Sequence, residues 1–452
     1  MLRRLSFQNF KSWPEVDIEF GQITGLFGTN SSGKTSLIQF LLLLKQTKDA
    51  TDRKTSLELN GPYVGLGVYG DMIHRHEVER PLAWSLALRR SKPLVVVDPT
   101  RKGAAVVANS PEFEMTGEVA TREQDPVATR LSYRVGEMAF SLVSKGRGDR
   151  DFELFAEGGD FRFIRNQGRP WQLPGPIKSY AFPDQARIYY QNASFLSDLE
   201  AAYEEEIDNI FYLGPLRRYP QRDYLWARSR PQDVGREGER AIDAILAATA
   251  ANELRNVKWK ARLQPFQEMI AHWLREMQLV RGFRVEEIAS GSNRWQAHVQ
   301  VRDGGTEALL TDVGFGVSQV LPVVTLLQYV PKHSTVILEQ PEIHLHPLAQ
   351  ANLADVLINA AIHRKVQVLV ESHSEHLLLR LQRRIAEGAV ESDGIKLYFC
   401  HTQRGVSKLE QLRLDLLGQI ENWPEHFMGD AFGETYAAEK ARLKRMQAAA
   451  AE

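Results

Sequence analysis

The chain has 452 residues, of which 43% are hydrophobic and 25% are charged, and its formal net charge is −1. This composition is typical of a globular protein that buries a large core in two or three domains. The apolar run at residues 40–44 is too short to cross a bilayer, and the N-terminal sequence MLRRLSFQNF lacks an export signal. Cys400 is the only cysteine, which excludes an internal disulfide and a cysteine-rich zinc site. We therefore expect a cytoplasmic protein with no membrane partner.

The first eighty residues are expected to form strands, a glycine-rich loop and a helix. Residues 2–7 and 16–20 alternate between apolar and polar side chains as strands do, and residues 23–27 form a short apolar strand. Residues 28–35 then match the pattern G-x-x-x-x-G-K-[ST] in full. Leucines and isoleucine recur at helical spacing over residues 37–44. The order of strand, loop and helix predicts a P-loop.

Such a loop binds a nucleoside triphosphate because its backbone amides and the following helix N-terminus all point at phosphate oxygens. Lys34 would contact the β- and γ-phosphates of ATP, and the Thr35 hydroxyl would bind Mg²⁺. A glycine and serine turn before an ordinary helix is the alternative interpretation. The residues predicted to contact ATP here are Gly28, Thr29, Asn30, Ser31, Ser32, Gly33, Lys34, Thr35 and Ser36.

The middle of the chain changes character twice. Residues 57–68 are rich in glycine and are a candidate γ-phosphate-sensing loop, although no glutamine can be assigned to that role. Short strands broken by Gly, Asp and Arg follow, the last at residues 161–164, and predict an antiparallel β lobe. Helices are expected at residues 194–209, 238–251 and 257–277. Because no heptad run is long enough for an extended coiled coil, any helical arm is short.

Strands and helices alternate from residue 280 onward, as in a parallel α/β sheet. In this region DVGFGVSQ, residues 312–319, opens an apolar helix. Its glycines, Gly314 and Gly316, leave the backbone open, while Ser318 is expected to cap the helix before Gln319. The amides of such a helix end suit a phosphate oxygen. An ordinary capped helix after a glycine turn remains the alternative.

The sequence TVILEQPE, residues 335–342, predicts a buried strand that ends in carboxylates. A hard cation such as Mg²⁺ needs oxygen ligands there, and the water that attacks the γ-phosphate needs an orienting base. Glu339 occupies the expected metal-binding position, and Gln340 occupies the position of the base. Because an amide cannot accept a proton, we expect slow hydrolysis unless Glu342 or a group from another subunit replaces it. A core strand that ends at a proline turn is the alternative.

Two histidine segments follow this strand. His344 and His346 are separated by one residue, but no third ligand accompanies them, so a dimer-interface loop is favoured over a metal site. The strand in VQVLVESHSEH, residues 366–376, delivers Glu371, Ser372 and His373 at its carboxyl end. Open α/β sheets bind ligands at that edge. His373 is therefore a candidate contact to the γ-phosphate, and a histidine that caps the next helix is the alternative.

The order of these motifs resembles ABC-type ATPases of the OLD and recombination-repair group, which share an SMC-like head, and especially nuclease-less AAA family members associated with antiviral defence. The resemblance covers residues 1–75 and 280–400 and rests on the NFKS turn at residues 9–12, the P-loop, GFGVSQVLP and LEQPEIHLHP. It implies an α/β fold, an ABC-type P-loop NTPase head with an inserted antiparallel β lobe and a short helical arm. The domains expected are 1–80, 81–205, 206–279, 280–400 and a C-terminal helical extension at 401–452, which includes NWPEHF at 422–427.

The resemblance also implies a function. Two copies would close head to tail around two ATP·Mg²⁺, with each P-loop facing the Gly314 to Ser318 segment of the other copy. Closure would control a separate effector, a nuclease or toxin, in a prokaryotic defence complex. A very slow or non-hydrolysing ATP-dependent clamp and a DNA-repair ATPase that binds DNA ends are the alternatives. Nucleic acid would contact an arginine-rich window, for which an ion-paired surface is the rival interpretation, through Arg217, Arg218, Arg222 and Arg228.

Overall fold

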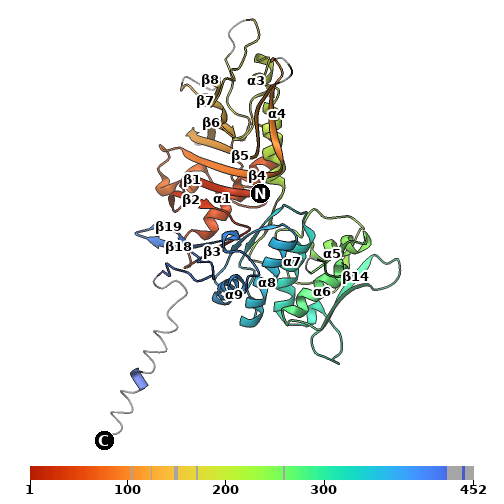
Figure 1. Ribbon diagram of the computed structural model, residues 1–452. Coiled ribbons are helices and arrows are strands. Elements are labelled where there is room, and N and C mark those ends of the chain that lie inside the picture. Colours follow the sequence, from red (N-terminus) through yellow and green to blue (C-terminus); the bar gives the residue numbers. More distant parts are fainter. Residues whose placement is uncertain are drawn as a thin grey trace, which may run out of the picture.

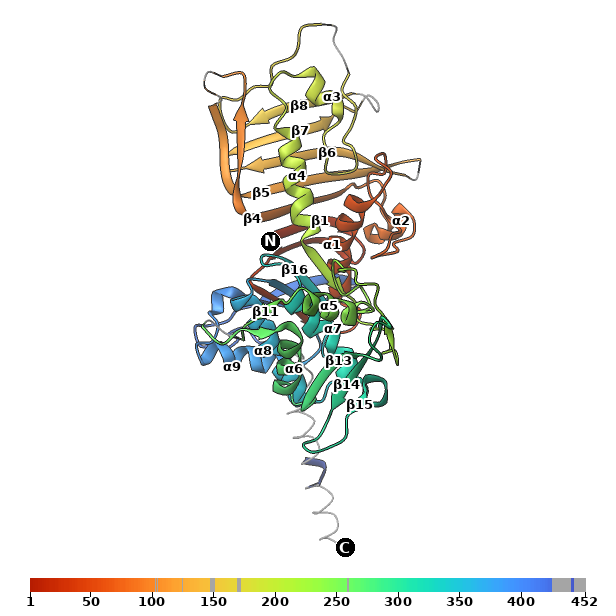
Figure 2. The ribbon, with the colours of Figure 1, turned by 90° about the vertical axis from the view of Figure 1, so that its right-hand side faces the viewer.

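The computed structural model of the chain describes residues 1–101, 103, 105–123, 125–146, 151–168, 172–257, 260–424 and 440–442. These residues form two lobes, a β-rich lobe and an α/β lobe, which meet near α1 (Lys34–Asp49) (Figures 1 and 2). In the described part of the chain, no helix combines the length and the apolar character that a membrane span requires.

A six-stranded sheet lies at the centre of the α/β lobe. Its strand order is β19-β18-β3-β17-β16-β9, and only the edge pair β18 and β19 is antiparallel. The strands are β3 (Ile23–Gly28), β9 (Ile210–Leu213), β16 (Thr335–Glu339), β17 (Gln367–Glu371), β18 (Ile395–Gln403) and β19 (Val406–Leu412). The predicted α/β class is confirmed.

Both faces of this sheet are covered, which explains why its strands are apolar without a break. Leu369 of β17 faces the cluster that contains the leucines of α1. Its neighbours Val368 and Val370 face the opposite cluster. That cluster includes α7 (Phe315–Tyr329), α8 (Pro347–His363) and α9 (Glu375–Ala386). The sheet is thus the middle of three layers, and its edges remain accessible.

The β-rich lobe is a seven-stranded antiparallel sheet in the order β2-β1-β4-β5-β6-β7-β8. Its strands are β1 (Leu2–Phe10), β2 (Trp13–Glu19), β4 (Leu82–Asp98), β5 (Ala105–Arg122), β6 (Asp125–Val135), β7 (Met138–Ser144) and β8 (Phe152–Glu157). The helix α4 (Leu196–Asp208) lies across one face of this sheet (Figure 2). The strand expected at residues 161–164 is irregular chain instead.

The β lobe is less separate from the first eighty residues than we expected. Strand β4 pairs with β1, so the expected boundary at residue 80 lies within one sheet. The reason is aromatic packing, because Phe40 of α1 stacks on Phe7 of β1 at 4.4 Å and meets Trp84 of β4 at 5.9 Å between ring centroids. One helix therefore packs against strands from both segments.

The helical segment at residues 241–276 belongs to the α/β lobe (Figures 1 and 2). Helices α5 (Ala241–Ala250) and α6 (Phe266–Glu276) share a core with α7. The helix expected from residue 257 begins only at Phe266, because Pro265 occupies the position before its first turn and residues 264–265 form a strand. The small strands are β10 (Tyr224–Leu225), β11 (Leu254–Arg255), β12 (Gln264–Pro265), β13 (Gly282–Glu287), β14 (Arg294–Gln300) and β15 (Ala308–Leu309).

The C-terminal segment differs from the predicted helical extension. Residues 401–403 continue β18, and β19 returns beside it through a hairpin at Arg404 and Gly405. Both turn residues have positive φ, 52° and 76°, which is the conformation of a two-residue hairpin turn. The NWPEHF segment lies partly outside the described residues. The remaining short helices are α2 (Tyr69–Met72), η1 (His74–His76), α3 (Asp184–Tyr189), η2 (Leu310–Asp312) and η3 (Ser392–Gly394).

Candidate functional site

Three parallel strands end side by side at one edge of the six-stranded sheet. Leu26 of β3 lies opposite Glu371 of β17, and Glu371 lies opposite Glu339 of β16. The P-loop and the two acidic strand ends therefore meet at the carboxyl edge, where open α/β sheets bind ligands. Because β17 lies between the other two strands, Glu371 is closer in the sheet to the P-loop strand than Glu339 is.

The P-loop needs its glycines. Gly28 has a φ of 140°, and a Cβ atom there would lie 2.0 Å from the carbonyl oxygen of Cys400. Gly33 has a φ of 97° and packs against Ser407 and Trp13, whose indole nitrogen donates to the Gly33 carbonyl at 3.1 Å. Only glycine meets both conditions without strain. The loop conformation is thus fixed by the strands around it.

Lys34 begins α1 and points back over the loop. Its Nζ donates to the carbonyl oxygens of Gly28 at 3.1 Å and Thr29 at 2.8 Å. The residue is 3% exposed, and burial lowers the pKa of its ammonium group. Nearby, the buried Ser32 hydroxyl has no hydrogen-bond partner among the described residues. A cation held inside a glycine cradle with an unpartnered hydroxyl fits a triphosphate.

Thr35 is the other residue predicted to bind Mg²⁺, and its neighbour is Glu371. The Thr35 hydroxyl lies 3.1 Å and 3.2 Å from the two carboxyl oxygens of Glu371. Burial, followed by the charge of Glu339, raises the pKa of Glu371 to about 7. Oxygen ligands of this kind fit Mg²⁺. Sequence analysis did not assign Glu371 to the metal, because the strand order that places it beside Thr35 is a tertiary feature.

Glu339, the carboxylate predicted to bind metal, lies one strand further from the P-loop. It is 4% exposed and accepts a hydrogen bond from the Tyr212 hydroxyl at 2.8 Å. Burial raises the pKa of Glu339. Its role as a metal ligand stays a prediction. Tyr212, on β9, is a contact that the sequence analysis missed.

Gln340 lies at a strained turn directly after β16. Its φ is 44°, a conformation that residues other than glycine rarely adopt. Its backbone amide donates to the Glu371 carbonyl at 2.8 Å, which ties the two strand ends together. The guanidinium of Arg217 donates to the carbonyls of Glu339 at 2.9 Å and Gln340 at 3.1 Å. Backbone strain held by its surroundings in this way is typical of functional sites.

Glu342 and His373 are connected across the same edge. One carboxyl oxygen of Glu342 accepts from the His373 amide at 2.7 Å, and its other oxygen is buried without a hydrogen-bond partner in the described structure. Burial raises the pKa of Glu342. The His373 ring remains exposed, and partial burial with the nearby Lys34 charge lowers its pKa. His373 does not cap α9, since the Ser374 hydroxyl accepts from the Leu377 amide at 3.0 Å.

These groups surround a cavity of about 220 Å³. The cavity brings together most of the P-loop residues, Gln340 and His373, as the sequence predicted, and it adds Glu371 and Ser12. Its lining residues are Ser12, Asn30, Ser31, Ser32, Gly33, Lys34, Thr35, Ser36, Gln340, Glu371 and His373.

The glycine-rich segment before α7 is not part of this cavity. The helix begins at Phe315 with Gly314 at the capping position, so the expectation that Ser318 caps the helix is wrong. Ser318 lies in the first turn, where its hydroxyl donates to the Phe315 carbonyl at 2.9 Å, and Gln319 is buried. Gly314 is open, since an added Cβ would meet no atom within 4 Å. The helix end is thus accessible to an external group.

The candidate sensing loop at residues 57–68 is held by α1. The Gln46 side chain donates to the carbonyls of Glu58 at 2.6 Å and Val64 at 3.1 Å. Tyr63 of this loop packs edge-on against Tyr212 at 6.4 Å, and Tyr212 in turn contacts Glu339. The loop therefore reaches the acidic strand end through two aromatic rings.

The two histidines after Gln340 lie in the turn that leads to α8. His346 caps α8, accepting from the Leu348 amide at 3.4 Å, and His344 has a φ of 64°. Among the described residues, no three His, Cys, Asp or Glu side chains form a group suited to a metal ion. Nothing in this geometry favours a metal at the histidine pair.

The arginine-rich window does not form one surface. Arg217 is 7% exposed and binds the backbone of the Gln340 turn, so the expectation that it contacts nucleic acid is corrected. Arg222 is exposed and pairs with Asp312 at 3.0 Å. Arg218 and Arg228 are exposed to solvent. Arg217 differs from the other three arginines because it lies shortly after β9, where its side chain is buried against the Gln340 turn.

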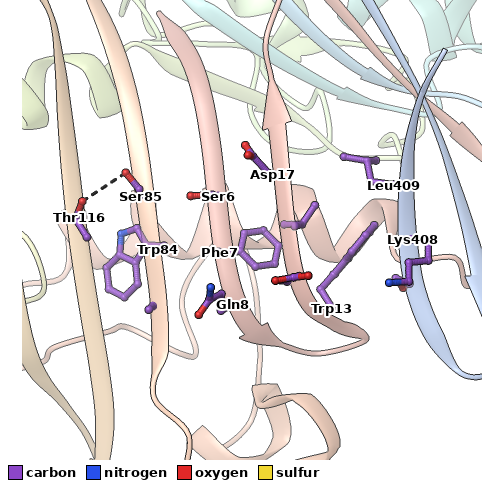
Figure 3. Close-up of a pocket in the computed structure, with 14 residues that line it drawn as sticks. Ser6, Phe7, Gln8, Trp13, Asp17, Trp84, Ser85, Thr116, Lys408 and Leu409 are labelled. Atoms are coloured by element: carbon purple, nitrogen blue, oxygen red, sulfur yellow. Dashed lines mark hydrogen bonds between the residues drawn. The ribbon is translucent and has the colours of Figure 1, made fainter. Parts of the chain in front are cut away.

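A larger hollow of about 570 Å³ is lined in part by Trp13, the residue whose indole contacts Gly33 of the P-loop (Figure 3). Strands β1, β2 and β4 line it together with Lys408 and Leu409 of β19. Its polar residues include Ser6, Gln8 and Asp17. Two carboxylates, Glu15 and Asp17, accompany its one cation, Lys408, and the glycine-rich loop does not line it, so this hollow suits a triphosphate less well than the cavity at the P-loop.

Comparison with known proteins agrees with this geometry. A family model described as "AAA domain, putative AbiEii toxin, Type IV TA system" matches residues 106–380, more than half of the chain. The chain belongs to this AAA domain family. A second AAA domain model matches residues 4–79, which include the P-loop. This AAA protein is therefore an ATPase by family, and the family implies that a nucleotide is used.

One curated relative is the OLD nuclease of Thermus scotoductus (strain ATCC 700910 / SA-01), which is 23% identical over 389 residues. The match covers 83% of this chain, and the chain spans 59% of that relative's length. Among solved structures, an SMC head bound to the C-winged helix domain of ScpA has a TM-score of 0.43 at 13% identity, covering 92% of this chain and 98% of that one. The SMC head domain from Thermotoga maritima has a TM-score of 0.38 at 12% identity, covering 91% and 99%. The AAA protein is thus related to the OLD nuclease, as the motifs indicated.

Proposed function

We propose that this AAA protein binds ATP·Mg²⁺ at the carboxyl edge of its six-stranded sheet and uses it as a dimeric switch. The observation that carries the proposal is the cavity in which Lys34, Thr35, Glu371 and Gln340 converge. Lys34 and the loop amides would hold the triphosphate. Thr35 and Glu371, with Glu339 behind them, would hold Mg²⁺, which supplies charge neutralisation at the phosphates when bound.

Hydrolysis would be slow in this arrangement. Gln340 occupies the position from which a base would receive the proton of the attacking water, and an amide only orients that water. Glu342 is the next carboxylate along the chain, but one of its oxygens is engaged by the His373 amide and the other is buried. His373 lines the cavity and would report the presence of the γ-phosphate.

The dimer would complete each site with the open end of α7 from the second copy. Exposed apolar side chains lie at that helix end, including Tyr219 and Phe315, which are 72% and 55% exposed. Tyr219 and Phe315 contact each other edge-on at 5.7 Å. Exposed apolar groups of this size beside an open helix N-terminus are typical of an interface.

We further propose that closure of the dimer controls a separate effector in a prokaryotic antiviral defence complex. The description of the family refers to a toxin and a toxin–antitoxin system, and the curated relative is a nuclease. Both support an effector that is switched by the ATPase, by analogy rather than by a feature of the site.

ATP turnover of three proteins tests the switch. We expect measurable turnover by the wild type and a fall to background in the Lys34→Ala variant, because the buried ammonium is the cation that faces the phosphates. Lys92→Ala, which removes an exposed lysine far from the cavity, serves as the matched control. Wild-type turnover unchanged by Lys34→Ala would contradict the assigned site.

The second candidate function is an ATP-dependent clamp that hydrolyses ATP very slowly or not at all. Gln340 favours it, because this residue lacks a carboxylate at the base position. In that case the wild type would turn over ATP near background, and Gln340→Glu would raise the rate. Robust wild-type turnover that Gln340→Glu does not increase would exclude the clamp.

A further inference from the structure

The amino edge of the six-stranded sheet contains a further, basic hollow of about 530 Å³. Its position follows from the chain, because Lys332 lies just before β16 and Arg364 lies just before β17. The parallel strands place these residues at the opposite edge from Glu339 and Glu371. The side chains that matter here are Arg230, Arg255, Tyr329, Lys332 and Arg364.

Positive charge exceeds negative charge in this hollow, which we call the amino-edge pocket. Glu253 pairs with Arg230 at 2.6 Å and also with Arg255. In the part of the chain that the structure describes, neither Lys332 nor Arg364 has an acidic partner. The lining of the pocket therefore contains four cations and no carboxylate, and Glu253 pairs with two of its arginines.

Arg364 carries the strongest indication of a ligand. It is 8% exposed, and its Nε and Nη2 atoms donate to the carbonyls of Leu327 and Val330. Its Nη1 atom has no acceptor among the described residues, although the side chain lines the pocket. Burial, followed by the charge of Arg255, lowers the pKa of Arg364 to about 9. Because Nη1 is not one of the atoms buried without a partner, it is open to the pocket, where an anion would supply a charge-assisted acceptor.

The other two arginines are held in place by aromatic rings. The Arg230 guanidinium lies 5.5 Å from the ring centroid of Tyr329, whose hydroxyl donates to the Pro231 carbonyl at 2.6 Å. Arg255 lies 5.4 Å from the Phe266 centroid and donates to the Gln328 carbonyl at 3.2 Å. Because these side chains are already ordered, binding a ligand costs little further conformational entropy.

We propose that the amino-edge pocket binds a phosphate group, supplied by a nucleic-acid backbone or by a small free phosphate compound. The planar guanidinium groups match phosphate oxygens in geometry and charge, and Lys332 adds a mobile point charge at the rim. This site is separate from the P-loop and does not depend on the proposed ATP switch.

The test is binding of two probes by the full chain at low salt. Fluorescence anisotropy of a short labelled duplex DNA reports the nucleic-acid source. Calorimetry with inorganic pyrophosphate reports the small-molecule source, and the Lys34→Ala background removes the lysine at the P-loop that pyrophosphate would also use. Lys332→Glu is the pocket variant, since this lysine is exposed on a loop, and Arg302→Glu is a matched charge reversal on an exposed turn. Arg230→Gln supplies a second pocket variant.

We expect Lys332→Glu to weaken binding of at least one probe by about five- to tenfold. The control Arg302→Glu should change the affinity by at most about twofold. For a nucleic-acid ligand, the slope of affinity against salt should also decrease by about one in the variant. Loss with DNA identifies a backbone phosphate, and loss with pyrophosphate alone identifies a small phosphate. The proposal is overturned if neither probe binds, or if the pocket variants and Arg302→Glu bind equally.

Discussion

The two edges of the six-stranded sheet differ in the sign of the charge that they bury. At the carboxyl edge, Glu339, Glu342 and Glu371 lie behind the P-loop, and burial raises the pKa of each. At the amino edge, burial lowers the pKa of Arg364. Strands β16 and β17 have five residues each, which separates the edges by roughly 15 Å.

This difference shows how one sheet prepares two kinds of site. Burial disfavours the ionised form of the side chains at both edges. A ligand of the opposite charge would therefore stabilise that ionised form at each edge. A cation with a triphosphate suits the acidic edge, where Lys34 and the glycine loop receive the phosphates. An anion alone suits the basic edge. Variants at each edge test this contrast.

Arg217→Ala is expected to have the largest effect on stability. Arg217 is a buried cation at the acidic edge, and its removal leaves the Glu339 and Gln340 carbonyls without their donor. We expect a loss of about 3–4 kcal/mol in the free energy of unfolding, measured with urea. Arg218→Ala, next in the chain but exposed, should change it by less than about 0.5 kcal/mol. Equal effects of the two substitutions would show that Arg217 does not hold the turn.

The pH dependence of stability separates the two edges. The pKa of Glu371 is raised from 4.5 to about 7, so the folded state retains a proton that the unfolded state releases in this interval. Stability without nucleotide should therefore fall as pH rises from about 4.5 to about 7, by at most about 3–4 kcal/mol from this group. Thermal melting at several pH values measures it. Glu371→Gln should flatten this slope in part, since Glu339 and Glu342 also titrate, and an unchanged slope would contradict the assignment.

Glu371→Gln also tests the cation at the acidic edge. If Glu371 supports Mg²⁺ beside Thr35, we expect ATP turnover at limiting Mg²⁺ to fall about 10- to 100-fold. High Mg²⁺ should restore part of the rate. Glu375→Gln, an exposed residue on α9, is the control and should behave as the wild type. A variant with normal Mg²⁺ dependence would leave Glu339 as the better candidate.

Tyr212→Phe should have the smallest effect. The substitution removes the hydroxyl that donates to Glu339, at 2.8 Å, and keeps the ring that packs on Tyr63. We expect a loss of about 1 kcal/mol in stability by urea unfolding. Tyr63→Phe, whose ring makes the same contact from the other side, should be close to neutral. A neutral Tyr212→Phe would mean that Glu339 finds another donor.

Features that depend on local sequence were predicted well. The P-loop follows from Gly28 and Gly33, whose backbone conformations no other residue adopts readily, and its strand and helix appeared where the apolar spacing placed them. The strand before Gln340 was predicted from its uninterrupted apolar residues. For the same reason, most residues of the cavity could be named from the sequence.

Features that depend on tertiary neighbours were not predicted from the sequence. Glu371 reaches Thr35 because β17 lies between β3 and β16, an order that no local pattern encodes. Arg217 was grouped with its arginine neighbours, although burial takes it into the site. The β19 hairpin was missed because Arg404 adopts a positive φ without being glycine or asparagine. Ser318 was mistaken for a cap because the helix starts at Phe315, before its apolar run begins at Val320.

The central claim is that the acidic edge is completed by a second copy through the open end of α7. Sedimentation velocity of the full chain, with and without saturating ATP·Mg²⁺, tests it most directly. We predict a monomer that becomes a dimer with nucleotide, and no such change in Lys34→Ala or in Gly314→Arg, which obstructs the helix end. A protein that stays monomeric at saturating nucleotide, or one that Gly314→Arg still allows to dimerise, would contradict the account.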